Sequence, residues 1–362
     1  MKNNLIFQIG LTLIPGIGPI TAKKLISHCG SVEAVFQEKK ELLTKIPHIG
    51  PVLAKEIAQQ SVLGRAEKEI DFMSKNNITA TSYLDDNYPE RLKNCVDSPI
   101  VLFSKGEFDW NQSKIISIVG TRNATSYGKS FCQSLVNDLS DYPVLIVSGL
   151  AYGIDVFAHK YSIENNVKTV AVLAHGLDRI YPTSHKNIAT QMLQNGGLIT
   201  EFLSETNLGR ENFVRRNRIV AGISDATIVV ESKKKGGAMI TAKLANDYNR
   251  DVFAVPGKWN DVFSSGCNHL IKTNQAHLCN SAQDIAYLLD WDKNQKNKTV
   301  RKEMLNQLEK EVVVLFENTS ELNIDQIKDS INLSFGQLAV VLTDLELKNV
   351  LHSSPGKIFS LK

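Results

Sequence analysis

The sequence predicts an α/β protein with an open, Rossmann-like parallel sheet at its centre. Three observations carry this prediction. The middle of the chain alternates apolar strand, glycine-containing turn and amphipathic helix several times. A repeated proline–glycine motif precedes this region and predicts a helical helix-hairpin-helix (SAM-like) domain. Three short helical patterns and a hairpin follow it, which predicts a winged-helix domain.

Six apolar segments are expected to form the parallel strands. Each is a continuous run rich in Val and Ile, which indicates burial on both faces of a sheet that helices cover. The segments are residues 115–119, 143–149, 169–176, 196–201, 226–232 and 251–257.

Composition places the chain among ordinary globular proteins. Of its 362 residues 43% are hydrophobic, and no apolar run is long enough to span a membrane. The N-terminus has no signal-peptide cleavage pattern. The five cysteines form no CxxC pair, so we expect neither a disulfide framework nor a metal site. These features predict a cytoplasmic protein without a membrane partner.

The net charge of +3 arises from 41 basic and 38 acidic residues, and the excess lies within residues 111–290. An excess this small is only a weak indication of a polyanionic partner, because local clustering matters more than the sum.

An internal repeat opens the chain. The segment LIPGIGPITAKKLISHCGS (13–31) is echoed by KIPHIGPVLAKEIAQQ (45–60), and each copy predicts a tight turn that opens a helix. The repeat resembles the helix-hairpin-helix motif, whose backbone N–H groups can bind a DNA phosphate. The second copy has His48 where the first has Gly16, which would hinder close backbone approach. A packing or docking module therefore remains an alternative.

The end of the chain begins with a polar linker at 291–299. The domain that follows, residues 300–362, contains three helices and a hairpin. Its third helix carries Asp344 and Glu346 but almost no basic residue before Lys348, whereas a helix in a DNA groove needs Lys or Arg. We therefore favour a protein-contact role for this domain.

Functional residues of an open α/β sheet gather where its strands end. The strand ends here lack a GxGxxG motif, an acidic residue after the second strand and a P-loop lysine, so we expect no nucleotide cofactor. They are instead rich in Gly, Ser and Thr with separated cations, which suits several phosphates in a row. The cations are Arg122, Lys186, Arg215, Arg216 and Arg218.

Several of these features also have structural interpretations. The lysines at 233–235 are typical of a solvated loop, and one arginine at 216–218 could simply pair with Glu201 or Glu231. His159 and His175 lack the neighbours of a hydrolase site and are more often structural. We therefore expect no catalytic residue.

The strand-end motifs resemble those of the DNA-processing protein A family (DprA, also called Smf). They are GTRNATSYG, VSGLAYGIDVFAH, AVLAHGLDRIYPTSHKN, GLITEF, FVRRNRIVAG, VVESKKKGGAMITAKLA, VFAVPG and SSGCNHLI. They occur in the expected order over 112–275. The resemblance implies a protein that binds single-stranded DNA through the Rossmann-like domain, forms a homodimer through it and loads the RecA recombinase during natural transformation.

By position, the resemblance implies that Arg122 is the main phosphate contact and Lys186 a second one. Backbone donors near Ser148 and Gly149 would shape the pocket, and Phe213 would pack on a base or close the core. The candidate DNA-binding residues are Arg122, Ser148, Gly149, Lys186, Asn187, Phe213, Arg216, Arg218, Gly236, Gly237 and Thr241. The chain departs from the family pattern in GTR, with Thr for Ser, and in the Gly-Ala of ESKKKGGAMITA; both changes keep small residues.

The predicted domains are a helical domain at 1–110, the Rossmann-like domain at 111–290, the linker and the winged helix. The predicted function is non-enzymatic, sequence-independent binding of single-stranded DNA, which protects the incoming strand and loads RecA during transformation or homologous recombination. One alternative is a nucleotide-processing enzyme of the phosphoribohydrolase type, in which Glu231 assists cleavage. A pure protein adaptor is another.

Overall fold

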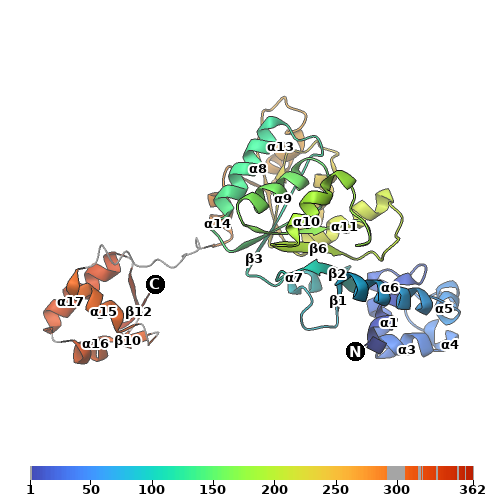
Figure 1. Ribbon diagram of the computed structural model, residues 1–362, viewed down its shortest axis with the longest axis horizontal. Helices are drawn as coiled ribbons and strands as arrows, with labels where there is room; N and C mark the ends of the chain where they lie inside the picture. Colours follow the sequence, from blue (N-terminus) through green and yellow to red (C-terminus); the bar gives the residue numbers. More distant parts are fainter. Residues whose placement is uncertain are drawn as a thin grey trace. The chain divides into compact units, whose positions relative to one another are not determined.

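The computed structural model describes residues 2–291, 306–316, 319, 321–331, 333–348, 350–354 and 356–361. The chain forms two compact units, Met1–Asn294 and Gln295–Lys362 (Figure 1). Each unit is described below by itself. Within the described residues, none of the helices combines the length and apolar character needed to cross a membrane.

The first unit is built on a nine-stranded sheet in the order β1-β2-β6-β5-β4-β3-β7-β8-β9. Strands β3 to β9 are joined by parallel pairings, while β2 pairs antiparallel with both β1 and β6. The strands are β1 (Thr79–Ser82), β2 (Val101–Gly106), β3 (Lys114–Gly120), β4 (Val144–Ser148), β5 (Lys168–Val172), β6 (Gly196–Thr200), β7 (Ala226–Val230), β8 (Asp251–Ala254) and β9 (His277–Leu278). The predicted parallel α/β sheet and its six strands, β3 to β8, are confirmed.

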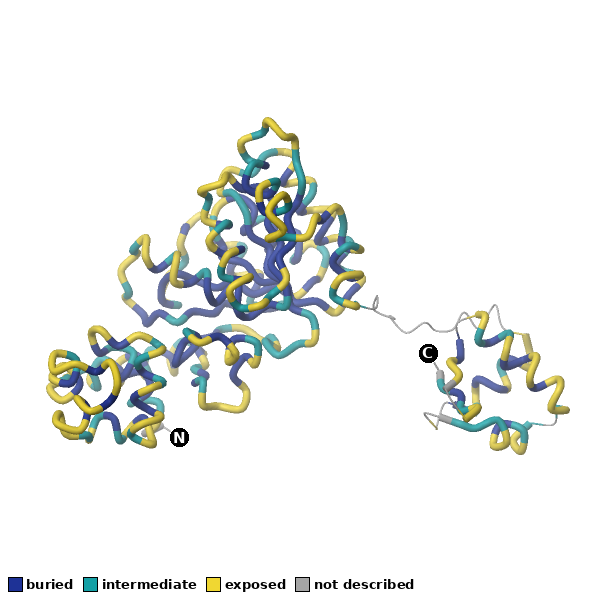
Figure 2. The backbone as a smooth tube through the Cα atoms, turned by 180° about the vertical axis from the view of Figure 1, so that it is seen from behind, coloured by how far each residue is buried: buried dark blue, intermediate teal, exposed yellow. Residues whose placement is uncertain are grey.

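Helices cover both faces of this sheet, because strands such as β3 direct apolar side chains to both sides. Ile116 and Ile118 pack into one core cluster with residues of α8 (Ser126–Leu139), α9 (Ile154–Glu164) and α14 (Ala282–Leu288). Ile115 and Val119 point to the other face and join a cluster with α7 (Glu90–Lys93), α11 (Arg210–Gly222), α12 (Gly237–Asp247) and α13 (Ser265–Lys272). Successive side chains of a strand point to opposite faces, so a continuous apolar run serves both cores. Figure 2 shows the central strands as largely buried.

The order in which the chain adds strands to the sheet reverses at β3. This reversal determines where a binding crevice can form. From β3 the chain proceeds to β4, β5 and β6 on one side, then returns through α11 to β7 on the other side of β3. The turns after β3 and β7 therefore diverge, and such a switch point leaves a crevice at the carboxyl ends of the strands. A short helix η1 (Thr183–His185) and α10 (Lys186–Met192) follow β5 at the same edge.

Six helices precede the sheet, and two of them begin at the repeated motif. They are α1 (Lys2–Leu13), α2 (Pro19–Cys29), α3 (Val32–Gln37), α4 (Lys40–Leu43), α5 (Pro51–Ala58) and α6 (Leu63–Asn76). Both α2 and α5 start with proline after an extended glycine N-cap. His48 has φ 71°, close to the 79° of Gly16, so the second turn keeps the left-handed geometry of the first.

Strands β1 and β2 were not expected from the sequence, and both precede the predicted domain boundary at 110/111. TATS and VLFSKG are short and pair antiparallel at an edge of the sheet. Their polar residues Thr81, Ser82 and Ser104 are nevertheless buried. Val101 and Phe103 of β2 share a core cluster with helices α1 to α6. The helices before the sheet are thus packed onto it, and the boundary itself stays a prediction.

The second unit contains three helices and a small antiparallel sheet ordered β10-β12-β11. The elements are α15 (Gln307–Val314), β10 (Glu321–Asn323), α16 (Ile324–Ser330), α17 (Phe335–Leu347), β11 (Leu351–Ser354) and β12 (Ile358–Leu361). The buried carboxylate of Glu309 accepts hydrogen bonds from Lys348 Nζ at 2.6 and 2.8 Å. Three helices and a hairpin are present as expected, and the winged-helix assignment stays a prediction. The predicted linker lies, apart from Trp291, outside the described residues.

Candidate functional site

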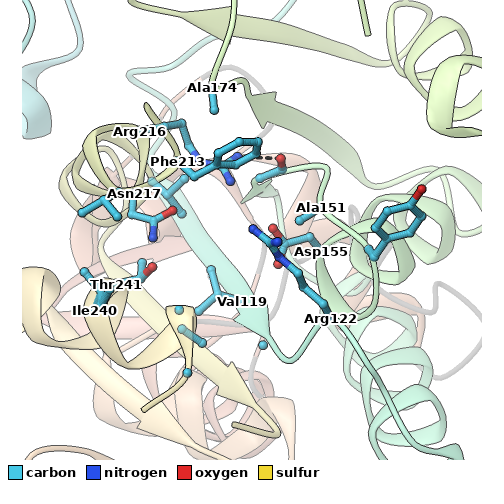
Figure 3. Close-up of a pocket in the computed structure, with 18 of the residues that line it drawn as sticks. Val119, Arg122, Ala151, Asp155, Ala174, Phe213, Arg216, Asn217, Ile240 and Thr241 are labelled. Carbon is cyan, nitrogen blue, oxygen red and sulfur yellow. Dashed lines mark hydrogen bonds between the residues drawn. The ribbon is translucent and has the colours of Figure 1, made fainter. Parts of the chain in front are cut away.

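A cavity of about 1060 Å³ opens at the carboxyl ends of β3, β4, β5 and β7 (Figure 3). Its walls come from the turn after β3, the loops after β4 and β5, the first turns of α11 and the loop that joins β7 to α12. The cavity therefore lies at the point where the strand order reverses, as expected for an open α/β sheet.

The charged residues that line the cavity are predominantly cationic. Five basic side chains and one carboxylate contribute to its wall. They are Arg122, Arg210, Arg216, Lys233 and Lys235, with Asp155 as the acidic residue. Cations gathered in a concave surface concentrate an anionic ligand.

Three helices begin beside this cavity without a side-chain hydrogen bond to their first turns. The N-caps of α9, α11 and α12 are Gly153, Gly209 and Gly236, and none of them provides such a cap. Gly209 and Gly236 themselves line the cavity. The first N–H groups of a helix have no partner within the helix and carry partial positive charge. The starts of α11 and α12 therefore provide backbone donors for an anion. At α9, the N–H groups of Ile154 and Val156 already donate to the carbonyls of Thr121 and Ala151, at 3.1 and 3.2 Å.

Glycine at position 153 allows one of these starts to approach the turn after β3. Gly153 has φ 77°, and a Cβ there would collide with the carbonyl oxygen of Thr121. The backbone N–H of Ile154 donates to that same carbonyl at 3.1 Å. The contact fixes the turn that carries Arg122 against the start of α9.

Arg122 and Phe213 form a cationic and aromatic surface on the cavity wall. The guanidinium carbon of Arg122 lies 5.5 Å from the centre of the Phe213 ring, and Tyr181 packs edge-on against that ring at 6.0 Å. Figure 3 shows Arg122 and Phe213 facing the same opening. Such a pair can hold a phosphate and offer a π-face to a base.

Arg216 also lines the cavity, and its Nη1 serves the fold, whereas its buried Nε has no hydrogen-bond partner among the described residues. It is 4% exposed, and its Nη1 donates to the carbonyl oxygens of Gly149, at 2.5 Å, and Val172. It thus ties together the chain segments that follow β4 and end β5. Burial raises the pKa of Asp155 and lowers that of Arg216, while the attraction between the two opposes both shifts.

The start of α8 differs from the open starts of α11 and α12, because a carboxylate of the protein itself lies beside it. Glu231, which is 2% exposed, accepts a hydrogen bond from the Thr125 backbone N–H at 2.9 Å and another from its hydroxyl. Thr125 in turn accepts a bond from the N–H of Gly128. The turn after β3 therefore contributes Arg122 and Asn123 to the cavity, whereas the N-cap of α8 is bonded to Glu231 and the Gly128 N–H to Thr125.

Of the predicted site residues, seven line the cavity and four do not. The seven are Arg122, Gly149, Phe213, Arg216, Gly236, Gly237 and Thr241. Ser148 is fully buried, and its hydroxyl donates to the carbonyl of Ile118 at 2.6 Å. Lys186 and Asn187 are exposed at the start of α10, outside the lining residues. The DNA-binding role of every residue in this set stays a prediction.

Arg218 has a structural partner, as one interpretation of the sequence anticipated. Its Nη2 donates to Glu201 at 2.5 Å, and its Nη1 donates to the carbonyl of Asp97. Arg215 pairs with the same Glu201 at 3.2 Å. The expected pairing of an arginine in this segment is confirmed, and it fastens α11 to the segment before β2.

Three of the cations that line the cavity are not among the predicted site residues. Lys233 and Lys235 are exposed, as predicted for a solvated loop, but they also line the cavity. Arg210 is the first residue of α11, directly after the glycine N-cap. A basic residue following glycine at a predicted helix start is the signal that could have found Arg210.

The two histidines near the site have structural partners. His159 Nδ1 lies 2.7 Å from the Thr169 hydroxyl, and burial lowers the pKa of His159 to about 3. His175 lies with Nδ1 2.8 Å from the Gly176 carbonyl and accepts a bond from the Tyr181 N–H; burial lowers its pKa as well. Both are neutral near pH 7. In the parts of the chain described above, no group of His, Cys, Asp or Glu side chains could hold a metal ion.

Family models match two regions of the chain. The model described as DNA recombination-mediator protein A matches residues 79–290, and that of a SAM-like helix-hairpin-helix tandem matches residues 9–60. The chain is 37% identical over 204 residues to the DNA processing protein DprA of Streptococcus pneumoniae, covering 56% of this chain and 72% of that protein. It is 41% identical over 199 residues to DprA of Bacillus subtilis, covering 55% and 67%.

Two solved structures resemble the fold. The crystal structure of DprA from Streptococcus pneumoniae aligns with a TM-score of 0.68 and 30% identity, over 79% of this chain and 98% of that one. DNA processing protein A from Helicobacter pylori aligns with a TM-score of 0.55 and 28% identity, over 61% and 99%. The latter structure was solved to describe how that protein binds single-stranded DNA.

Proposed function

The chain belongs to the DNA recombination-mediator protein A family, and from this premise we propose that its cavity binds single-stranded DNA without reading the sequence. One observation carries the proposal: the uncapped starts of α11 and α12 and five cations surround a single cavity that also presents an aromatic face. Backbone donors and cations recognise phosphates, which are the same in every nucleotide.

A single strand suits this cavity better than a duplex. Phe213 and Arg122 lie on its wall, and a base can stack on them only if it has left a base pair. Stacking tolerates any base, because every base has a π-face. The single-stranded DNA binding of the Helicobacter pylori relative supports the same choice.

The cellular role that we propose is to protect incoming single-stranded DNA and load the RecA recombinase during natural transformation or homologous recombination. We also propose that the protein is a cytoplasmic homodimer, joined through the Rossmann-like domain, and has no enzymatic activity. These parts rest on the family resemblance. The names of its relatives, DNA processing proteins, support a role in DNA processing.

A phosphoribohydrolase activity has weaker support. The residue that would assist it, Glu231, is buried, bonded to Thr125 and absent from the cavity lining. Its carboxylate stabilises the start of a helix instead of facing a ligand.

The test is a fluorescence-anisotropy titration with single- and double-stranded DNA of equal length at several salt concentrations. The wild type is expected to prefer the single strand. Arg122→Ala is expected to weaken this binding about 10- to 100-fold and to reduce the slope of log K against log salt by about 1, because one phosphate contact is lost. Lys186→Ala should have a smaller effect, since Lys186 lies outside the lining residues.

The matched control is Lys168→Ala, which removes an exposed cation from the amino end of β5, at the opposite edge of the sheet. It should change neither affinity nor slope. Equal binding by wild type and Arg122→Ala would contradict the proposed site. Equal affinity for both DNA forms would contradict the preference for a single strand.

A further inference from the structure

Trp259 lies on the loop after β8 with 90% of its surface exposed, the largest exposed fraction of any large hydrophobic side chain described. The other two tryptophans have packing roles. Trp110 donates its indole N–H to the Asn87 carbonyl at 2.7 Å, and Trp291 packs against Tyr142 at 6.2 Å. An aromatic side chain of this size gains little by pointing into water, so its position suggests a ligand.

The loop that carries Trp259 is held at both ends. On one side, the Asn268 side chain accepts a bond from the Gly257 N–H at 3.2 Å and donates to the Gly257 carbonyl at 3.0 Å. On the other, Asp261 accepts bonds from the Ser264 hydroxyl at 2.7 Å and the Phe263 N–H at 3.1 Å. Trp259 is therefore presented between two fixed turns.

This loop packs against the loop that supplies lysines to the cavity. The N–H of Gly266 donates to the Ser232 carbonyl at 2.7 Å, and a Cβ on Gly266 would lie only 2.6 Å from that oxygen. Lys233 Nζ lies 5.3 Å from the centre of the Phe263 ring. Ser232 and Lys233 both line the cavity. The surface is thus continuous from the cavity rim to the loop of Trp259.

The charge of this surface is positive. Exposed lysines follow one another at 233–235, and Lys258 directly precedes Trp259. The nearest acid along the loop is Asp261, and the hydrogen bonds from Ser264 and Phe263 lower its pKa, so it stays ionised and offsets Lys258. The net positive charge of the surface therefore comes from the lysines at 233–235. Cations that alternate with an exposed aromatic ring are the arrangement that binds a single strand, with phosphates on the lysines and a base on the ring.

We propose that Trp259 is a second base-stacking platform, which a DNA strand reaches as it leaves the cavity across the lysines at 233–235. The inference rests on the proposed function, because the strand must occupy the cavity first. A short oligonucleotide fills the cavity alone, whereas a longer one extends to Trp259. The platform therefore sets the length of strand that the protein covers.

Affinities for oligothymidylates of about 6 and about 20 nucleotides, a range that spans the usual site sizes, test the proposal. Trp259→Ala is expected to weaken binding of the longer strand about 5- to 50-fold and that of the shorter one less than about 2-fold. Trp259→Phe should retain most of the affinity for the longer strand that Trp259→Ala loses. The salt slope should stay unchanged, because no phosphate contact is removed.

Tyr287→Ala is the matched control, since Tyr287 is 85% exposed but lies on α14. It should leave both affinities unchanged. A second measurement uses the Trp110→Phe, Trp291→Phe double variant, in which Trp259 is the sole tryptophan. Its fluorescence should be quenched by the longer strand and not by the shorter one.

Distinct results overturn the two proposals. If the short strand binds but Trp259→Ala binds both lengths like the wild type, the platform is refuted and the cavity assignment stands. If neither length binds the wild type, both proposals fail. If Trp259→Ala lowers self-association in sedimentation velocity while DNA binding is unchanged, Trp259 belongs to a contact between copies of the chain and the platform is refuted.

Discussion

Helices α8 and α12 both begin just after strands that lie side by side in the sheet, β3 and β7, and both starts contain glycine. At α8, the carboxylate of Glu231 binds the N-cap Thr125, whose hydroxyl accepts a bond from the Gly128 N–H. At α12, the N-cap Gly236 has no side chain, and Gly236 and Gly237 face the cavity. A helix start can accept an external anion only where the protein supplies none of its own. A glycine-containing turn between strand and helix does not reveal which case applies.

The largest expected effect comes from placing one methyl group at each start. Gly128→Ala should lower the free energy of unfolding by about 2–4 kcal/mol, because the new Cβ collides with the buried carboxylate of Glu231. Gly237→Ala has no atom within 4 Å of its new Cβ and should be neutral or stabilising by up to about 1 kcal/mol. Urea denaturation measures both values. Equal free energies of unfolding for the two variants would contradict the proposed difference between the filled start of α8 and the open start of α12.

Glu231→Gln examines the filled start alone. It should lower the free energy of unfolding by about 1–2 kcal/mol, because hydrogen bonds to a charged carboxylate become bonds to a neutral amide. Affinity for single-stranded DNA should be unchanged under conditions where the variant is folded, since Glu231 does not line the cavity. A loss of affinity as large as that of Arg122→Ala would place the start of α8 within the DNA site.

Gly237→Asp would convert the open start into a filled one. The new carboxylate has free space, should stabilise the helix by about 0.3–1 kcal/mol, and should compete with phosphate for the backbone donors. We expect single-stranded DNA affinity to fall about 10- to 30-fold, a free-energy change of about 1.4–2 kcal/mol. Gly237→Asn is the neutral control and should lose much less. Similar losses for Asp and Asn would attribute the effect to side-chain volume instead of charge.

The smallest expected effect concerns how the open start of α11 is positioned. The loop before α11 is fastened to α6: Glu69, which is buried, accepts bonds from the Ser204 N–H at 2.9 Å and its hydroxyl at 2.5 Å. Arg65 donates to the Ser204 carbonyl at 2.6 Å. Ser204→Ala removes the hydroxyl bond and should weaken DNA binding about 2- to 5-fold through a displaced helix start. Unchanged affinity would show that the open start needs no such support.

Much of the fold was predictable because burial on both faces leaves a simple pattern. The Val- and Ile-rich runs of β3 to β8 are typical of strands that helices cover on both faces. The repeated proline and glycine predicted the starts of α2 and α5. Strands β1 and β2 escaped prediction because TATS and VLFSKG resemble loop sequence. Strand β2 pairs with β6, which lies far along the chain, so their contact is set by tertiary structure.

The sequence predicted individual residues of the site better than the contacts that bring them together. Motifs identified Arg122, Phe213 and the glycines after β7, all of which line the cavity. The role of Glu231 depends on a contact with Thr125, which is 106 residues away, so local sequence could not separate a catalyst, an arginine partner and a helix cap. The convergence of Lys233 and Arg210 on one cavity is likewise a property of the folded sheet.

The pairing of β2 with β6 has a consequence for solubility. Residues 103–106 cover the edge of β6, whose neighbouring residues Leu198 and Ile199 are buried and apolar. Without β2, that edge would expose unpaired N–H and C=O groups beside apolar side chains, which is a template for pairing between molecules. The N-terminal part of the chain thus protects the central sheet from edge-to-edge aggregation, whatever else its helical repeat binds.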